Sequence, residues 1–289
     1  MKDFASQRAR LSQKLSETVI SERMLNLFSG NFGQAARDAL EEANSLTLEE
    51  VTIYLDRLPK QLDGFRLVHL SDIHHSPFTS LEHIRRTVEI ANALKPEMFV
   101  LTGDYVSHET EYIAPMAEEM GKLVSEFGTF ACLGNHDHWT DAELVTYFLR
   151  RENITVLNNQ GFRFHARDAS LWLCGVDDLT VRQTNLRRAL RGSKKEEMKL
   201  LLAHNPKVLN RAARAGVDLM LAGHTHGGQV RLRPTNEGKL LMPRHRRISG
   251  LHRRKDTQLY ITRGIGTVVL PVRYQCPPEI SLLQLRSNG

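Results

Sequence analysis

The sequence has few cysteines and no long apolar run, and each scarcity narrows what the protein can be. Its 289 residues include three cysteines, Cys132, Cys174 and Cys276, and none has the CxxC spacing of a thiolate zinc site. We therefore expect core thiols in a reducing compartment. No run of about 18 or more apolar residues occurs, so no segment is expected to span a membrane. Residues 1–15 lack the apolar stretch of a secretory signal, which favours a cytoplasmic protein.

Acidic residues are outnumbered, and the basic excess is concentrated in one segment. The sequence has 39 Lys and Arg against 33 Asp and Glu, a net charge of +6, within an ordinary globular composition. A basic surface suits a phosphate ester, a nucleic acid or an acidic membrane face. Against one acid, Glu237, the segment 231–255 carries Arg231, Arg233, Lys239, Arg244, Arg246, Arg247, Arg253, Arg254 and Lys255. We expect a loop or hairpin that binds the anionic part of a substrate or an anionic bilayer.

The first 48 residues differ in pattern from the rest of the chain. Apolar residues recur there at helical intervals, for example at Leu11, Leu15 and Val19. From Val51 the chain alternates apolar and polar residues, which predicts a half-buried strand. We therefore divide the chain into a helical extension, 1–48, and one large domain, 49–289. A basic amphipathic helix in the extension could lie on a membrane or a partner, or pack on the domain itself.

Apolar runs and helical stretches alternate after residue 64. In the first half, three strand-like runs each end in a polar turn and precede a helical stretch; the helices are expected at 81–94, 113–126 and 141–151. Further strand-like runs occur at 171–179, 198–206, 217–230, 259–266 and 280–286. This order implies parallel strands with crossover helices. In such sheets, ligands bind beyond the carboxyl ends of the strands, where the polar turns fall.

Five short polar clusters follow these apolar runs. They are Asp72-Ile73-His74, Gly103-Asp104, Gly134-Asn135-His136-Asp137, His204-Asn205-Pro206 and Gly223-His224-Thr225-His226. Their carboxylate, amide and imidazole groups suit Mn²⁺, Fe, Mg²⁺, Zn²⁺ or Co²⁺ better than copper or an iron–sulfur cluster. Two ligands two residues apart, as in Asp72-x-His74, would share a face if the backbone is extended. The preceding glycines would allow a sharp turn and leave room for a substrate.

These five blocks, in this order, resemble the full motif set of the calcineurin-like metallophosphoesterase superfamily, over about residues 64 to 285. The resemblance implies a four-layer α/β/β/α sandwich of two mixed sheets flanked by helices. It also implies two divalent cations, with Mn²⁺ the leading choice. The first metal would be held by Asp72, His74 and His226, the second by Asn135, His204 and His224, and Asp104 would bridge both.

The same resemblance implies hydrolysis of a phosphodiester or pyrophosphate bond by a hydroxide shared between cations roughly 3.5–4 Å apart. His136 would donate a proton to the leaving group or stabilise charge there, and Asp137 would orient its imidazole. Three more residues are candidate substrate contacts. Trp139 would stack on a substrate or cover the site, or merely pack; Arg273 would bind phosphate; and His75 would contact substrate or be an exposed neighbour.

Segments near the C-terminus, including Gly227-Gly228-Gln229-Val230 and Leu270-Pro271-Val272-Arg273, are similar to a bacterial branch of membrane-associated phosphodiesterases. That branch more distantly resembles the UDP-2,3-diacylglucosamine pyrophosphatases. A phosphorylated small-molecule, nucleotide or lipid-linked substrate is therefore expected, with peripheral contact at an anionic inner membrane face. A nuclease of the same fold is an alternative, but the aromatic–basic interleaving of a nucleic-acid groove is missing. A metal-bound scaffold is the non-enzymatic alternative, and the intact motif set argues against it.

Overall fold

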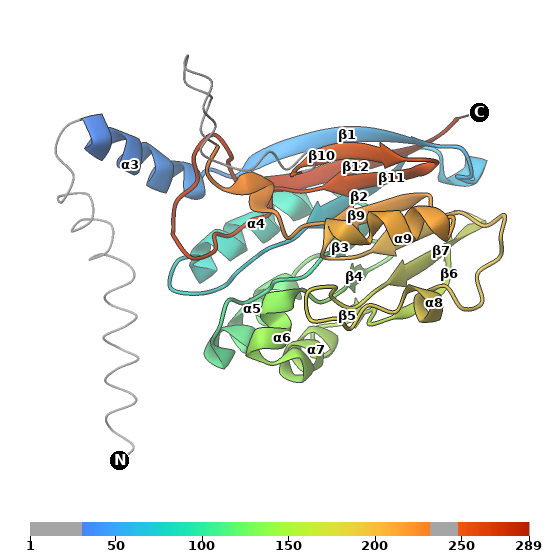
Figure 1. The fold of residues 1–289 in the computed structure, drawn as a ribbon, viewed down its shortest axis with the longest axis horizontal. Helices are drawn as coiled ribbons and strands as arrows, with labels where there is room; N and C mark the ends of the chain where they lie inside the picture. The colour runs from blue at the N-terminus through green and yellow to red at the C-terminus, as the bar shows by residue number, and fades with distance from the viewer. Residues whose placement is uncertain (1–30, 232–247, 289) are drawn as a thin grey trace.

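Two six-stranded sheets pack face to face in the computed structural model, which describes residues 31–231 and 248–288 (Figure 1). Helices cover the outer face of each sheet, which gives the layer order α/β/β/α. The predicted fold class is confirmed. The helical pattern predicted for residues 1–30 lies outside the described residues, and so does most of the basic segment, at 232–247.

The first sheet is mixed and has the strand order β1-β12-β2-β3-β4-β5. Strands β2 to β5 run parallel, as the alternation of strands and helices predicted, while β12 runs antiparallel to β2 and parallel to β1. The strands are β1 (Thr47–Leu55), β2 (Phe65–Leu70), β3 (Met98–Leu101), β4 (Thr129–Ala131), β5 (Ile154–Val156) and β12 (Glu279–Ser287).

The second sheet has the order β10-β11-β9-β8-β7-β6, with a parallel centre and an antiparallel pair at each edge. Its strands are β6 (Gln160–Ala166), β7 (Ala169–Gly175), β8 (Lys199–Leu202), β9 (Leu219–Ala222), β10 (Gly250–Arg254) and β11 (Thr257–Ile261). The central strands β8 and β9 are buried along their whole length, as expected for parallel strands covered on both faces.

Three apolar layers stabilise the sandwich: one between the sheets and one beneath the helices on each outer face. Successive side chains along a strand point to opposite faces, so neighbouring residues join different layers. Leu67 of β2 joins the cluster between the sheets, whereas its neighbour Val68 joins the cluster beneath the helices of the first sheet. Those helices are α4 (Leu81–Ala93), α5 (Ile113–Met120) and α7 (Ala142–Arg151). The second sheet is covered by α8 (Leu186–Ala189) and α9 (Leu209–Arg214).

Local signals explain where these helices begin and end. Ser80 and Asp141 accept backbone N–H bonds from the first turns of α4 and α7, so both begin where the predicted patterns begin. Helix α5 ends at Met120, earlier than the predicted residue 126, and the chain turns at Gly121. A short helix that the sequence did not predict, α6 (Asn135–Thr140), begins within the third polar cluster.

Helix α3 (Asn31–Ala43) contacts the domain through a few hydrogen bonds near its C-terminal end. The Ala39 carbonyl accepts the Arg273 N–H at 2.8 Å, and the Glu42 carboxylate accepts the backbone N–H groups of Gln275, at 2.9 Å, and of Cys276. Strand β1 starts at Thr47, ahead of the boundary expected at residue 49, and the division into 1–48 and 49–289 stays a prediction. Within the described ranges, every helix falls short of the length and apolarity needed to cross a bilayer.

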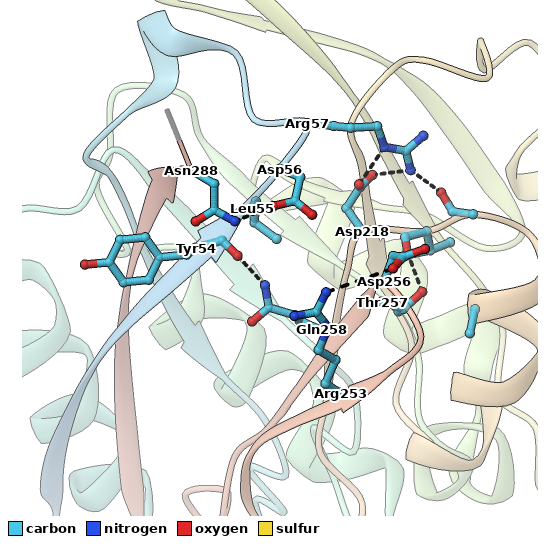
Figure 2. A pocket seen from close by; sticks show the side chains of 13 residues that line it. Tyr54, Leu55, Asp56, Arg57, Asp218, Arg253, Asp256, Thr257, Gln258 and Asn288 are labelled. Carbon is cyan, nitrogen blue, oxygen red and sulfur yellow. Dashed lines mark hydrogen bonds and ion pairs between the residues drawn. The ribbon is translucent and has the colours of Figure 1, made fainter.

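An ion pair links the two sheets at the end of the sandwich opposite the carboxyl ends of β8 and β9 (Figure 2). Arg57, just after β1, donates to both carboxylate oxygens of Asp218, just before β9, at 2.7 and 2.8 Å. Asp218 also accepts the backbone N–H of Lys199 at 2.7 Å. The pair therefore joins the turn after β1, in the first sheet, to the starts of β8 and β9 in the second.

Replacing the carboxylate of this pair should destabilise the fold without affecting the distant polar clusters. Asp218→Ala leaves the Lys199 N–H without its acceptor and the Arg57 guanidinium with only the carbonyls of Lys195 and Gly216, so the free energy of unfolding should fall by about 2–3 kcal/mol. Urea unfolding followed by circular dichroism measures the change. Asp256→Ala is the matched control, because this side chain at the same end is 97% exposed, and it should shift stability by less than about 0.5 kcal/mol. Equal effects of the two changes would contradict the assignment.

Candidate active site

The seven predicted metal ligands come from five strand ends. Asp72 and His74 follow β2, Asp104 follows β3, Asn135 opens α6 after β4, His204 follows β8, and His224 and His226 follow β9. Six of them, together with His136, form three overlapping groups, and within each group the ligand atoms lie within 4.8 Å of one another: Asp72, His74 and His226; His74, Asp104 and His136; and Asp104, His204 and His224. Most of these side chains are buried.

The carboxylate of Asp104 lies at the centre of the cluster. One oxygen, Oδ2, is 3.1 Å from Nε2 of His204 and 3.5 Å from Nε2 of His74. The other, Oδ1, accepts the backbone N–H of His136 at 2.9 Å. Asp104 therefore faces both halves of the cluster with one oxygen, while the backbone of α6 fixes the orientation of its carboxylate.

The cluster has two halves, one with Asp72, His74 and His226 and the other with Asn135, His204 and His224. In each half, two imidazole nitrogens face each other at a short distance. Nε2 of His74 is 3.1 Å from Nε2 of His226, and Nδ1 of His224 is 3.2 Å from Nε2 of His204. Two nitrogen lone pairs repel each other at this distance unless a proton or a cation lies between them. In addition, Oδ1 of Asn135 is buried without a hydrogen-bond partner among the described residues. Unpaired oxygen and nitrogen donors of this kind fit divalent cations.

Burial and mutual charge set the protonation of these groups. Burial lowers the pKa of His74 to about 3 and that of His224 to about 4, so both are neutral and keep a lone pair. Burial opposes the charge on His204, but the facing Asp104 carboxylate outweighs it and raises the pKa of His204 to about 10. Burial likewise opposes the charge on Asp104, but His204 and His74 hold the pKa of Asp104 well below its usual range. A cation binding here would displace the proton on His204.

Five of the predicted ligands have left-handed backbone conformations, which the sequence did not predict. The φ angles are 51° for Asp72, 50° for His74, 55° for Asp104, 70° for His224 and 49° for His226. The argument that Asp72 and His74 share a face through extended backbone is therefore wrong, although both side chains do reach one cluster. Left-handed non-glycine residues are uncommon and are held in place by their surroundings.

Hydrogen bonds between the strand ends hold these conformations. The Asp72 N–H donates to the Gly103 carbonyl at 2.9 Å, and the His74 N–H donates to the Asp104 carbonyl at 3.0 Å. The His224 N–H lies 3.0 Å from both carboxylate oxygens of Asp72. Each turn is thus fixed by its neighbour in space rather than by its own sequence.

Two of the predicted glycines leave room for carboxylates rather than for a substrate. A Cβ atom on Gly134 would lie 2.2 Å from Oδ1 of Asp104. A Cβ atom on Gly223 would lie 2.0 Å from Oγ of Ser71 and 2.2 Å from Oδ2 of Asp72. All three distances are shorter than real Cβ contacts. A larger residue at Gly134 would therefore displace Asp104, and one at Gly223 would displace Asp72.

His136 is half-buried at the rim of the cluster. Its Nδ1 lies 3.0 Å from the Ser107 carbonyl, which orients the ring and leaves Nε2 available. The ring centroid is 4.7 Å from that of His74 and 4.7 Å from that of the exposed Trp139, edge-to-face in both cases. His136 and Trp139 therefore lie side by side next to the cluster, with Trp139 exposed to solvent.

The predicted role of Asp137 behind the His136 imidazole is wrong. Its carboxylate accepts the backbone N–H groups of Asp104, Tyr105 and Gly134 at 2.8–2.9 Å and does not contact the His136 ring. Burial and the charge of Asp104 raise the pKa of Asp137 to about 7, against these three donors, which favour the ionised form. Asp137 joins the turn after β3 to the turn after β4.

Arg273 is not a substrate contact, because its side chain is fully buried. Its guanidinium donates to the carbonyls of Arg263, Gly264, Gly266 and Cys276 at 2.5–3.2 Å. The loop it braces packs behind Asp72, where Gly266 N–H donates to the Asp72 carbonyl at 2.7 Å. Arginine in a Pro-Val-Arg turn carries no sequence signal that separates this structural role from phosphate binding.

His75 is neither exposed nor open to a substrate through Nδ1. It is buried, Nδ1 lies 2.9 Å from the Thr79 carbonyl, and its ring packs edge-on against Tyr112. Two described arginines of the basic segment lie at opposite ends of the sandwich. Arg231 donates to the Gly227 carbonyl at 2.7 Å, close to His226, whereas Arg253 lines the far end with Asp218 (Figure 2).

Sequence reasoning missed the residues that support the ligands from behind. Nδ1 of His204 is 2.7 Å from the Thr102 carbonyl, which directs Nε2 toward Asp104. The Thr102 hydroxyl in turn lies 2.8 Å from Nε2 of the buried His69. A histidine in the middle of an apolar strand is the one signal that could have drawn attention to this support.

Known proteins have similar amino-acid sequences. The pattern of the family described as calcineurin-like phosphoesterase matches residues 65–228. The chain is 32% identical over 225 residues to the phosphodiesterase YaeI of Escherichia coli (strain K12), covering 76% of this chain and 82% of that protein. It is 29% identical over 280 residues to the metallophosphoesterase YkuE of Bacillus subtilis (strain 168), covering 90% of this chain and 96% of that one.

A vertebrate protein is also similar. The chain is 33% identical over 251 residues to the transmembrane protein with metallophosphoesterase domain of Danio rerio, covering 82% of this chain. The match spans 56% of that relative, so the chain corresponds to little more than half of it. The family pattern covers more than half of the chain and includes all seven predicted metal ligands. The chain therefore belongs to the calcineurin-like phosphoesterase family and is a hydrolase of the metallophosphoesterase type.

Proposed function

We propose that this protein hydrolyses a phosphodiester or pyrophosphate bond with the help of two divalent cations. The observation that carries the proposal is the Asp104 carboxylate, which faces His74 on one side and His204 on the other. Mn²⁺ is the leading choice of metal, with Fe, Mg²⁺, Zn²⁺ and Co²⁺ as alternatives, because the donors are oxygen and imidazole nitrogen.

The residues divide into two ligand sets. Asp72, His74 and His226 would hold one cation, and Asn135, His204 and His224 the other, with Asp104 contributing to both. Bound cations of this kind lower the pKa of a coordinated water and neutralise charge on phosphate oxygens. The support from Thr102 behind His204 fixes which ring nitrogen is offered.

The remaining chemistry belongs to side chains at the rim. His136, oriented by the Ser107 carbonyl, would hold a proton at Nε2 for the departing oxygen. Trp139 packs against His136 and is exposed, so its ring would cover the leaving group or stack on it. Neither residue needs to move far, because both lie on the short helix α6 that also presents Asn135.

The substrate class is supported by charge and by the relatives. The net charge of +6 favours an anionic substrate, and the Escherichia coli relative is named a phosphodiesterase. We include a nucleotide or lipid-linked phosphoester, and peripheral contact with an anionic membrane, within the proposal. The cytoplasmic location and the distant similarity to UDP-2,3-diacylglucosamine pyrophosphatases stay predictions.

The proposal predicts metal-dependent cleavage of a generic diester. Purified protein loaded with Mn²⁺ should release p-nitrophenolate from bis-p-nitrophenyl phosphate, and chelation followed by dialysis should abolish turnover. Asp104→Asn should lower kcat by more than about 10³-fold, because the carboxylate that faces both ligand sets is lost. Binding of two metals without turnover of any diester or pyrophosphate would contradict hydrolysis and favour a scaffold. Steep salt dependence with DNA or RNA would instead favour a nuclease.

Proton donation by His136 predicts a dependence on the leaving group. His136→Ala should lower kcat by about 10²–10⁴-fold for a diester with an alkyl leaving group, which needs protonation. The loss should be much smaller for p-nitrophenolate, which leaves without a proton. His108→Ala is the matched control, since its exposed ring lies 5.2 Å from the His136 ring, and it should change kcat by less than about threefold. Equal losses for both leaving groups would contradict proton donation.

A further inference from the structure

A short loop beside the metal-ligand cluster exposes apolar side chains in a strained conformation. Val269 has a φ angle of 66° and is 79% exposed, and the adjacent Leu270 is 58% exposed. Valine is branched at Cβ, so the left-handed region is unfavourable for it, and an outlier of this type is unusual. Exposing both side chains to water contributes nothing to the hydrophobic core.

The loop is nevertheless held firmly in this conformation. The side chain of Gln229 donates to the carbonyls of Val268 and Leu270, both at 3.1 Å, and accepts the Val268 N–H at 3.0 Å. Gln229 is itself attached to the cluster, because its N–H donates to the His226 carbonyl at 2.9 Å. The exposed pair is thus fixed relative to a metal-ligand residue.

A third exposed apolar side chain lies nearby, on a second loop. Phe78 is exposed in the turn between Ser76 and Thr79, which follows the ligand His74. The Thr79 hydroxyl accepts the Thr267 N–H at 3.3 Å, so the two loops are in contact. Phe78, Val269 and Leu270, here called the apolar rim, therefore lie beside the half of the cluster that contains His74 and His226.

Cations accompany the apolar rim. Arg86 is exposed on α4, one turn from His83, whose Nε2 lies 3.2 Å from the Ile265 carbonyl at the base of the loop. The Arg231 guanidinium bonds to two neutral groups, the Gly227 carbonyl and the Ser249 hydroxyl, and so keeps its charge unneutralised by these contacts. Apolar side chains flanked by arginine match a surface of hydrocarbon beneath anionic headgroups.

We propose that the apolar rim inserts into the surface of an anionic lipid bilayer. Three side chains are far too few for a stable protein interface, which buries on the order of 800 Å² per partner. They suffice for shallow insertion assisted by nearby cations. This contact explains the strained backbone at Val269. The left-handed conformation directs the branched side chain outward, and Gln229 keeps it there.

Bilayer contact at this rim would place the cluster at headgroup depth. The phosphoester of an amphiphile could then reach the ligands without the lipid leaving the membrane. Both the bilayer contact and the choice of an amphiphilic substrate rest on the proposed function, which includes peripheral contact with an anionic membrane.

Cosedimentation tests the contact with vesicles of phosphatidylcholine containing roughly one-quarter phosphatidylglycerol. The full chain should bind, and Val269→Asn and Leu270→Asn should each weaken binding by about tenfold, because an inserted apolar side chain is lost. Asparagine tolerates left-handed backbone, so Val269→Asn should keep the fold, which thermal unfolding checks. Val124→Asn is the matched control, since this valine is 72% exposed elsewhere on the surface, and its binding should equal that of the unmodified chain.

Asp104→Asn should bind vesicles like the unmodified chain, which separates failure of this inference from failure of the proposed hydrolysis. Equal binding by all variants, or no binding by the unmodified chain, would overturn the inference. A concentration-dependent dimer in analytical ultracentrifugation, weakened by Val269→Asn without any vesicle binding, would also overturn it and assign the rim to a second copy of the chain.

Discussion

The carboxylate of Asp104 is the contact on which the two halves of the site depend. It lies 3.5 Å from a histidine that follows β2 and 3.1 Å from one that follows β8, so it joins groups contributed by both sheets. Its second oxygen is bound by the backbone of α6, and the absence of a side chain on Gly134 allows that approach. Stacking the two sheets with their carboxyl ends together is what brings these groups within reach of one oxygen.

A cluster of this kind repels itself, and the structure opposes that repulsion with backbone hydrogen bonds. Buried imidazoles face each other at about the distance of a hydrogen bond, while five ligand residues have left-handed φ angles. The supporting contacts come from outside the cluster: Asp137 binds three backbone N–H groups, and the buried Arg273 guanidinium fixes the loop behind Asp72. The same loop carries the strained Val269, which Gln229 holds in place, so the loop braced behind Asp72 also presents part of the apolar rim.

Much of this could be predicted from sequence, because period and motif order are local signals. The runs around Val68, Phe99 and Leu201 predicted buried strands, and the polar clusters at their ends predicted one shared site. The roles of Asp137 and Arg273 could not be predicted in this way. A carboxylate next to a histidine, or an arginine in a turn, has the same local sequence whether it binds a substrate or a backbone amide, and only the fold brings its partner within range. Left-handed backbone at Asp72 and His74 is likewise imposed by contacts from neighbouring turns rather than by residue type.

The central claim is that Asp104 stands between two cation sites built from opposite sheets. Anomalous scattering at the manganese edge, from crystals grown with Mn²⁺, tests it most directly. Two peaks are expected to flank Oδ2 of Asp104, one beside Asp72, His74 and His226 and the other beside Asn135, His204 and His224. A single peak, or a pair of peaks in which Asp104 contacts neither or only one, would contradict it.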